Sequence, residues 1–168
     1  EKRRSLLKNA IHNSGRCVRV IEAHNGISAL IGTNTQVKDD SGNIYGFDGL
    51  WISGLTESAE RGMPDIELHG LNSRIALARE ISRVSDKPIV VDGDTGGTQE
   101  QLIYNCLNFE EIGVSAIIVE DKIFPKNNSL DERKSQDLAE PKEFAKKIKN
   151  TKAALHSPDF MVIARIKA

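Results

Sequence analysis

Short apolar runs rich in β-branched residues recur along the chain and alternate with segments of helical periodicity. The runs are residues 17–21, 49–52, 88–91, 116–119 and 161–164. Several of them are apolar at nearly every position, which is typical of parallel strands that are buried on both faces. Alternation of such strands with helices predicts βαβ units around a parallel sheet.

Helices are predicted between these runs from apolar residues at helical spacing and from start and stop signals. The apolar positions of three predicted helices are Leu71, Ile75, Ala78 and Ile81, then Leu102, Cys106, Phe109 and Ile112, then Phe144, Ile148 and Leu155. Thr98 followed by Gln101 predicts a capping box at the start of the second helix, and Gly113 predicts its end. Pro141 predicts the start of the third, and residues 4–13 predict a short helix before the first strand.

Two architectures fit this order: an open doubly wound sheet and a (β/α) barrel. The first strand is followed by Glu-Ala-His-Asn-Gly and by no GxGxxG turn, so the dinucleotide-binding form of the open sheet is disfavoured. A whole barrel needs about 250 residues, so five strands in one domain of 168 residues would be part of one. Residues 33–46 and 124–140 are polar and are predicted to be loops, the second long enough to act as a gating loop.

The composition narrows the class of protein. With 39% hydrophobic residues, 28% charged residues and a net charge of −1, the chain is neither disordered nor built to bind a nucleic-acid backbone. No apolar run approaches the roughly 20 residues of a membrane span, and no N-terminal segment has the order of a secretory signal. The two cysteines, Cys17 and Cys106, predict buried thiols in a reducing compartment, and we expect a cytoplasmic protein. The last residues continue directly from an apolar run, so we expect the chain to be a fragment.

Polar residues follow each predicted strand. The segments after the five strands begin at Glu22, Ser53, Asp92, Glu120 and Arg165. Because the carboxyl ends of parallel strands meet at one edge of a sheet, we expect these side chains to gather there.

Three acids at this edge, Asp92, Asp94 and Glu120, favour a cation that neutralises them. Carboxylate ligands without a converging histidine or cysteine indicate Mg²⁺ or Mn²⁺ rather than zinc. The alternative is that the acids cap helices or pair with lysine and arginine.

Other residues at the same edge suit an anionic substrate. Backbone N–H groups of residues 53–55 could bind a small anion, and Arg165 could bind a carboxylate or phosphate. The alternatives are a tight turn and a structural ion pair. His24 could be a ligand or a hydrogen-bonded structural residue, and Trp51 could belong to the core or wall the site.

Five segments in this order resemble the phosphoenolpyruvate mutase/isocitrate lyase superfamily. They are residues 22–31, 49–55, 90–97, 119–130 and 161–166. The resemblance implies an α/β fold, the (β/α)8 TIM barrel, of which this chain would contain the first five βα units. It also implies Mg²⁺-dependent enzymes that act on small 2-oxo and 2-hydroxy acids, and a homo-oligomer for the full-length protein.

The loop after Glu120 separates the branches of this superfamily. Its carbon–carbon lyases carry Lys-Arg-Cys-Gly-His or Lys-Lys-Cys-Gly-His there, whereas this chain has Lys-Asn-Asn-Ser at residues 126–129. The mutase branch carries Glu-Asp-Lys, five residues, then Asn-Ser, which residues 120–129 satisfy. The hydrolases tend to have threonine where Asn128 stands. The resemblance therefore favours interconversion of phosphoenolpyruvate and phosphonopyruvate, with phosphonopyruvate hydrolysis or a non-catalytic carboxylate- and metal-binding domain as alternatives.

The resemblance also assigns roles to the metal and carboxylate sites. Asp92 would ligate Mg²⁺, with Asp94 and Glu120 holding its waters. The residues that would bind the substrate carboxylate, or lie beside it, are Trp51, Ser53, Gly54 and Leu55.

Around the phosphoryl group, Asp65 would face the migrating group and Arg165 would bind phosphoryl or carboxylate oxygens. The residues of the gating loop that would close over substrate are Lys126, Asn128 and Ser129. Lys167 departs from the family, which usually has an acid at this position. The family's later histidine lies beyond residue 168, so the fragment alone is expected to be inactive.

Overall fold

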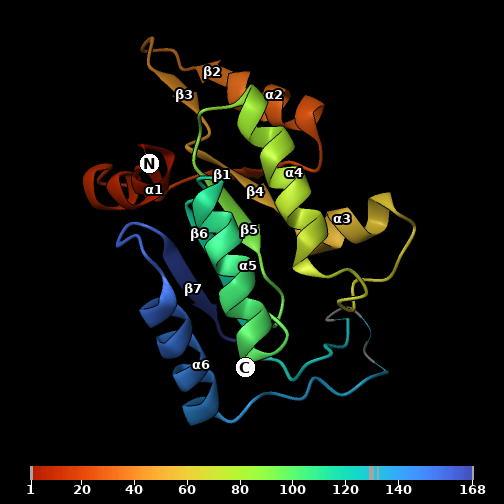
Figure 1. The fold of residues 1–168 in the computed structure, drawn as a ribbon. Helices are drawn as coiled ribbons and strands as arrows, with labels where there is room; N and C mark the ends of the chain where they lie inside the picture. The colour runs from red at the N-terminus through yellow and green to blue at the C-terminus, as the bar shows by residue number, and fades with distance from the viewer. Residues whose placement is uncertain (1, 129–130, 132, 168) are drawn as a thin grey trace.

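A five-stranded parallel sheet forms the centre of the computed structural model, which describes residues 2–128, 131 and 133–167. The strands are β1 (Val20–Glu22), β4 (Gly49–Ile52), β5 (Ile89–Asp92), β6 (Ala116–Glu120) and β7 (Met161–Arg165). Their order in the sheet is β1-β4-β5-β6-β7, and every neighbouring pair is parallel. The sheet grows in one direction, without the reversal of a doubly wound sheet, so the prediction of successive βα units is confirmed (Figure 1).

Four helices cover one face of this sheet. They are α2 (Gly26–Asn34), α4 (Leu71–Val84), α5 (Gln99–Glu111) and α6 (Pro141–Ala154), and they lie next to one another in this order (Figure 1). The predicted apolar faces point into the core between helices and sheet, where Ile81 and Phe109 are fully buried. Alternate strand residues such as Leu50, Val91 and Ile117 complete that core.

The predicted helix ends are also confirmed. Thr98 and Gln101 form the capping box of α5, and Gly113 follows its last turn with φ of +83°. Pro141 begins α6, whose first N–H groups are capped by the Glu140 carboxylate.

The first helix, α1 (Lys2–Asn13), closes the amino-terminal side of the sheet. Its buried Leu7 packs against Val90 and Ala116 on the sheet face that the other helices leave open. Arg3 donates hydrogen bonds to the carbonyls of Ser82 and Ser85 at the end of α4. The opposite, carboxyl edge is thereby left for the site, beside the short helix α3 (Gly54–Glu60).

Two predictions are wrong. Residues 33–46 are not one loop: Asn34 ends α2, and β2 (Gln36–Lys38) pairs with β3 (Ile44–Gly46) in an antiparallel hairpin. These strands have three residues each and no buried face, so apolar patterning does not distinguish them from a polar loop. Cys17 is exposed rather than buried, because it precedes β1 instead of lying within it; Cys106 is buried as expected.

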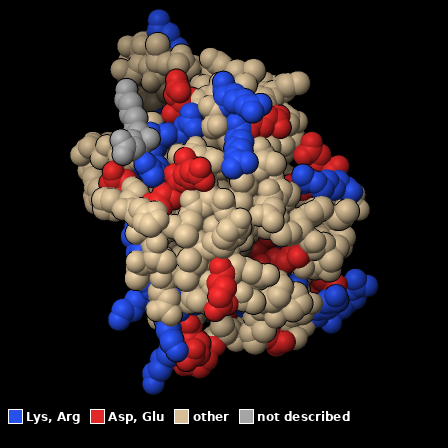
Figure 2. Space-filling model, viewed as in Figure 1, with Lys and Arg blue, Asp and Glu red and all other residues tan. Residues whose placement is uncertain are grey.

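The surface agrees with the balanced composition. Figure 2 shows one face, on which acidic and basic side chains are interspersed over large uncharged areas. None of the described helices is long and apolar enough to cross a membrane.

Candidate active site

Strand alternation places the site on the sheet face away from α2, α4, α5 and α6. Val90, Ile118 and Ile163 lie on that face. Asp92, Glu120 and Arg165 each lie two residues further along the same three strands, so their side chains point to the same side. Register pairs Asp92 with Ile118 and Glu120 with Arg165. Asp92 and Glu120 therefore lie on the same face of the sheet, and the predicted site requires this.

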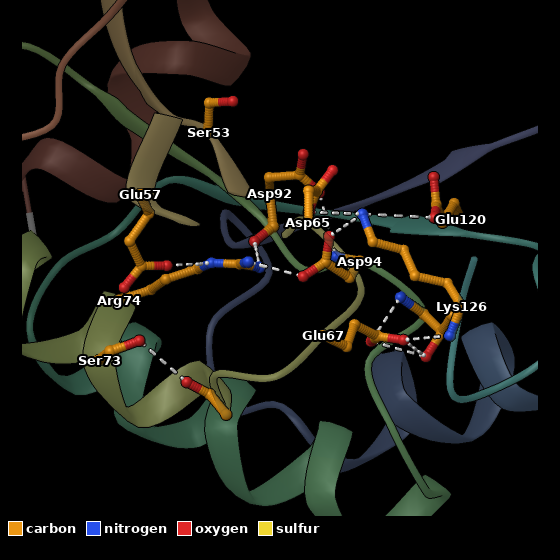
Figure 3. A network of polar contacts seen from close by, with 12 residues as sticks. Ser53, Glu57, Asp65, Glu67, Ser73, Arg74, Asp92, Asp94, Glu120 and Lys126 are labelled. Carbon is orange, nitrogen blue, oxygen red and sulfur yellow. Dashed lines mark hydrogen bonds and ion pairs between the residues drawn. The ribbon is translucent and has the colours of Figure 1, made fainter. Parts of the chain in front are cut away.

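Lys126 lies at the centre of the acids. Its ammonium group is 2.6 Å from Asp94 Oδ1, 3.0 Å from Asp65 Oδ1 and 3.9 Å from Glu120 Oε1 (Figure 3). Its side chain is only 5% exposed. Burial works against the charge on Lys126, but Asp94 and Asp65 outweigh burial and raise its pKa. The Lys126 side chain therefore supplies positive charge inside the group of acids, and it joins the predicted gating loop to the site.

Arg74 of α4 holds the acids from the opposite side. Its Nε donates to Glu57 Oε2 at 2.8 Å, its Nη1 to the carbonyl of Asp92 at 2.5 Å, and its Nη2 to Asp94 Oδ2 at 2.6 Å (Figure 3). Burial would lower the pKa of Arg74, but the nearby carboxylates of Asp94 and Asp92 raise it. Arg74 was not among the predicted site residues, although an arginine three residues after Leu71, on the apolar stripe of a helix, is a signal that could have identified it.

The Asp92-Gly93-Asp94 segment needs its glycine. A Cβ atom at Gly93 would lie 2.6 Å from the carbonyl oxygen of Ile118, to which the Gly93 N–H donates at 2.7 Å. Asp94 has φ of +50°, its N–H donates to Asp92 Oδ1 at 3.0 Å, and its carbonyl accepts the Glu120 N–H at 2.7 Å. The backbone itself therefore fixes Asp92, Asp94 and Glu120 beside one another.

The two aspartates respond to their surroundings in opposite directions. Burial and the charge of Asp94 raise the pKa of Asp92. Burial also acts against ionisation of Asp94, but Arg74 and Lys126 outweigh it and lower the pKa of Asp94. Neighbouring acids whose pKa values move apart are a feature of functional sites.

Glu67, which no sequence pattern singled out, connects the predicted gating loop to the segment after β5. Its carboxylate accepts from the Thr95 N–H at 3.0 Å, from Thr95 Oγ1 at 2.8 Å and from the Lys126 N–H at 3.2 Å. Burial raises the pKa of Glu67. A positive φ of 57° at this residue brings the carboxylate to both segments, which no spacing in the sequence indicates.

The predicted carboxylate-binding segment lies next to Arg74. A Cβ atom at Gly54 would be 2.7 Å from Arg74 Nη2 and 3.0 Å from Asp94 Oδ1, so glycine permits this close approach. Ser53 is buried and its side chain makes no capping bond to α3, whereas Leu55 is exposed. Trp51 is half-buried among the apolar residues of the open sheet face, and its Nε1 has no hydrogen-bond partner among the described residues.

The remaining predicted residues lie at the edge of this group. Arg165 Nη1 is 3.9 Å from Asp92 Oδ2, and Lys167, the departure from the family, places Nζ 3.4 Å from Glu120 Oε2. His24 pairs with the Glu22 carboxylate at 3.0 Å, and the ion pairs of Asp92, Asp94 and Glu120 do not include His24. The Asn128 carbonyl accepts from Gln136, and Ser129 lies outside the described residues.

The carboxylate side chains of Asp92, Asp94 and Glu120 are of the chemical type that binds a divalent cation. Glu120 Oε1 is buried and has no hydrogen-bond partner among the described residues, and carboxylate oxygens are the ligands that Mg²⁺ prefers. In the described part of the chain, however, no three acidic, histidine or cysteine side chains are arranged as a metal-binding group. Lys126 and Arg74 supply the positive charge in this arrangement, so the metal ligands stay a prediction.

Comparison with known proteins identifies the family. The model of the phosphoenolpyruvate phosphomutase family matches residues 7–168. The chain belongs to this family. Members of the phosphomutase family with similar sequences include the phosphoenolpyruvate phosphomutase of Tetrahymena pyriformis, 36% identical over 163 residues, which are 96% of this chain and 51% of that protein. The phosphonopyruvate hydrolase of Variovorax sp. (strain Pal2) is 34% identical over 157 residues, 93% of this chain and 51% of the hydrolase.

Solved structures give the same result. The phosphoenolpyruvate phosphomutase of Streptomyces platensis subsp. rosaceus superposes with a TM-score of 0.83 at 35% identity, covering 95% of this chain and 52% of that one. Phosphonopyruvate hydrolase in complex with oxalate and Mg²⁺ superposes with a TM-score of 0.82 at 32% identity, covering 98% and 52%. The chain thus spans about half the length of these phosphomutase-family relatives and has their α/β fold.

Proposed function

We propose that the protein carrying this chain is a phosphoenolpyruvate mutase, which interconverts phosphoenolpyruvate and phosphonopyruvate. The observation that supports this most strongly is the position of Lys126, which reaches from the Glu-Asp-Lys…Asn-Ser loop into contact with Asp65 and Asp94. This loop carries the mutase pattern, and Asp65 is the residue that the resemblance places against the migrating phosphoryl group.

The proposed reaction moves a phosphoryl group within one molecule. The bond from phosphorus to the enol oxygen of phosphoenolpyruvate breaks, and a bond from phosphorus to the methylene carbon forms, with no net gain or loss of protons. Phosphoryl transfer has a loose transition state, so the protein mainly positions groups and neutralises charge.

The described residues divide these tasks. Backbone N–H groups of residues 53–55 would hold the substrate carboxylate, and Arg165 would hold phosphoryl oxygens. Lys126 would add positive charge where the phosphoryl group is in transit, beside Asp65. Asp65 either accepts the phosphoryl group covalently or steers it between the two atoms of the pyruvyl unit.

Asp92, Asp94 and Glu120 would hold Mg²⁺, Asp92 directly and the other two through water. When bound, Mg²⁺ supplies positive charge to the enolate oxygen of the pyruvyl unit. Glu120 is suited to this role because its Oε1 is buried without a hydrogen bond among the described residues.

The gating loop decides between transfer and hydrolysis, because water that reaches the phosphoryl group in transit diverts it to phosphate. Asn128 would sit over the phosphoryl group and exclude that water. Phosphonopyruvate hydrolase is the second candidate function, because a protein of that name matches as closely as the mutases do. The proposal also places the protein in the cytoplasm and treats the full-length protein as a homo-oligomer.

A spectrophotometric assay with phosphonopyruvate and Mg²⁺ separates the two functions. A mutase produces phosphoenolpyruvate, seen as a rise in ultraviolet absorbance from its enol double bond. A hydrolase produces pyruvate, seen as NADH consumption with added lactate dehydrogenase. We expect the first signal, and we expect Asp65→Asn to abolish it. Absence of both signals in the wild type, with a folded protein, would leave the non-catalytic alternative and refute the proposal.

A further inference from the structure

Arg74 and Glu57 form a buried ion pair directly behind the proposed metal ligands. The side chains of Arg74, Glu57 and Asp94 are 2%, 1% and 2% exposed. Burying a guanidinium and two carboxylates is costly unless each is paired and hydrogen-bonded. All three are paired here, but even a fully paired buried ion group often adds no net stability, so its presence points to a role in the site.

The geometry of Arg74 links three segments that the site requires. One guanidinium contacts Glu57 of α3, the Asp92 carbonyl at the end of β5 and the Asp94 carboxylate. Glu57 is held in turn by Arg61, whose Nη1 lies 2.9 Å from Glu57 Oε1. Ion pairs with Glu57 and Asp94 alone would not require the third hydrogen bond, which Arg74 donates to the backbone carbonyl of Asp92.

These contacts determine which way Asp94 presents its second oxygen. Oδ2 is occupied by Arg74 at 2.6 Å, so Oδ1 faces the other way, 2.6 Å from the Lys126 ammonium. Gly54 allows the guanidinium to reach this position, because a Cβ atom there would lie 2.7 Å from Nη2. Figure 3 shows Asp94 between Arg74 on one side and Lys126 on the other.

We propose that Arg74, anchored on the Asp92 carbonyl and supported by Glu57, is a positioning residue that orients Asp94 for binding a divalent cation. This proposal rests on the proposed function only in taking Asp92, Asp94 and Glu120 as the metal site. The planar fork of arginine is essential to it, because three partners in different directions must be held at once. A lysine at the same position keeps the charge but has no such fork.

Mn²⁺ binding, measured by electron paramagnetic resonance or calorimetry, tests this role without any catalytic assay. Arg74→Lys should weaken Mn²⁺ affinity by about tenfold or more, because the charge stays and the orientation is lost. The matched control is Arg61→Lys, the same change at a guanidinium that contacts Glu57 but not the proposed ligands. Its affinity should stay within about twofold of the wild type. Unchanged affinity in Arg74→Lys would overturn the proposal.

A double-mutant cycle separates positioning from general support of the fold. In an Asp94→Asn background, Arg74→Lys should change Mn²⁺ affinity by less than about threefold, because the oriented carboxylate is gone. An equal loss in both backgrounds would show that Arg74 acts on the fold and not through Asp94.

Two further outcomes are informative. If Arg74→Lys does not fold, Glu57→Gln replaces it; this variant keeps Arg74 and should weaken Mn²⁺ binding about threefold, whereas unchanged affinity overturns the role. If the wild type binds no Mn²⁺ at all, the metal site and this role both fail. A wild type that binds Mn²⁺ and an unaffected Arg74→Lys variant refute the positioning role alone.

Discussion

Replacing Lys126 with methionine removes the ammonium group from the acid cluster while keeping most of the side-chain volume. Asp94 and Asp65 then lose a partner at 2.6 Å and 3.0 Å in a site where Lys126 is 5% exposed and Asp94 is 2% exposed. We expect Lys126→Met to destabilise the protein and to do so most strongly at neutral pH.

The magnitude follows from the burial of the pair. Removing one partner of a buried ion pair typically costs about 3–5 kcal/mol, because the remaining charge is left without compensation. Arg74 still pairs with Asp94 in the variant, so the loss should be at the lower end, about 3 kcal/mol. Glu120, 3.9 Å away, adds little to this figure.

The pH dependence has a definite sign. Lys126 contributes to the lowered pKa of Asp94, and a carboxyl group with a lowered folded-state pKa stabilises above its unfolded value of about 3.9. That contribution is lost as pH falls through the lowered pKa. The difference between wild type and Lys126→Met should therefore be largest between about pH 5 and pH 9 and should shrink below about pH 4.

Urea unfolding at a series of pH values measures this difference. Lys87→Met is the matched control, because Lys87 is also partly buried but its ammonium donates to a backbone carbonyl, that of Phe47, at 2.6 Å. Its effect should be nearly constant between about pH 4 and pH 7, since carbonyls do not titrate. A loss below about 1 kcal/mol for Lys126→Met at neutral pH, or the same pH dependence in both variants, would contradict the stabilising charge interaction of Lys126 with the acids.

Three further predictions concern the gating loop, the thiols and the backbone. In the full-length enzyme, Asn128→Ala should lower turnover by at least about tenfold, the effect of one lost transition-state hydrogen bond, with Mg²⁺ affinity unchanged; normal turnover would remove Asn128 from its role. In native protein only the exposed Cys17 should react rapidly with a thiol reagent, because burial raises the pKa of Cys106 to about 12, and Cys17→Ser should abolish the rapid phase. Gly93→Ala should lower the free energy of unfolding by about 1–3 kcal/mol, because its Cβ would lie 2.6 Å from the Ile118 carbonyl; an unchanged urea midpoint would contradict that contact.

The fold was predictable where local signals and burial agree. Apolar strand patterns located all five parallel strands to within a few residues, and Thr98 and Pro141 marked helix starts because capping depends on nearby residues. Position at strand ends also placed Asp92 and Glu120 on one face, since parallel strands bring their carboxyl ends together.

Contacts between distant segments were not predictable in the same way. Nothing in the sequence indicates that Arg74 contacts Asp94 or that Glu67 accepts from the Lys126 N–H, because these contacts depend on how α4 and the segment at Lys126 pack. The acids were expected to need a cation, but the sequence did not show that Lys126 would supply one. The hairpin at residues 36–46 was missed because its strands have no buried face.

Phosphorus NMR of the protein carrying this chain, with phosphonopyruvate and Mg²⁺ in ¹⁸O-labelled water, distinguishes the proposed mutase reaction from hydrolysis in one experiment. We expect the phosphonate resonance to be replaced by that of phosphoenolpyruvate, with no ¹⁸O in its non-bridging phosphoryl oxygens, because the phosphoryl group never meets water. Inorganic phosphate that carries ¹⁸O, or a phosphonate signal that stays unchanged, would contradict it.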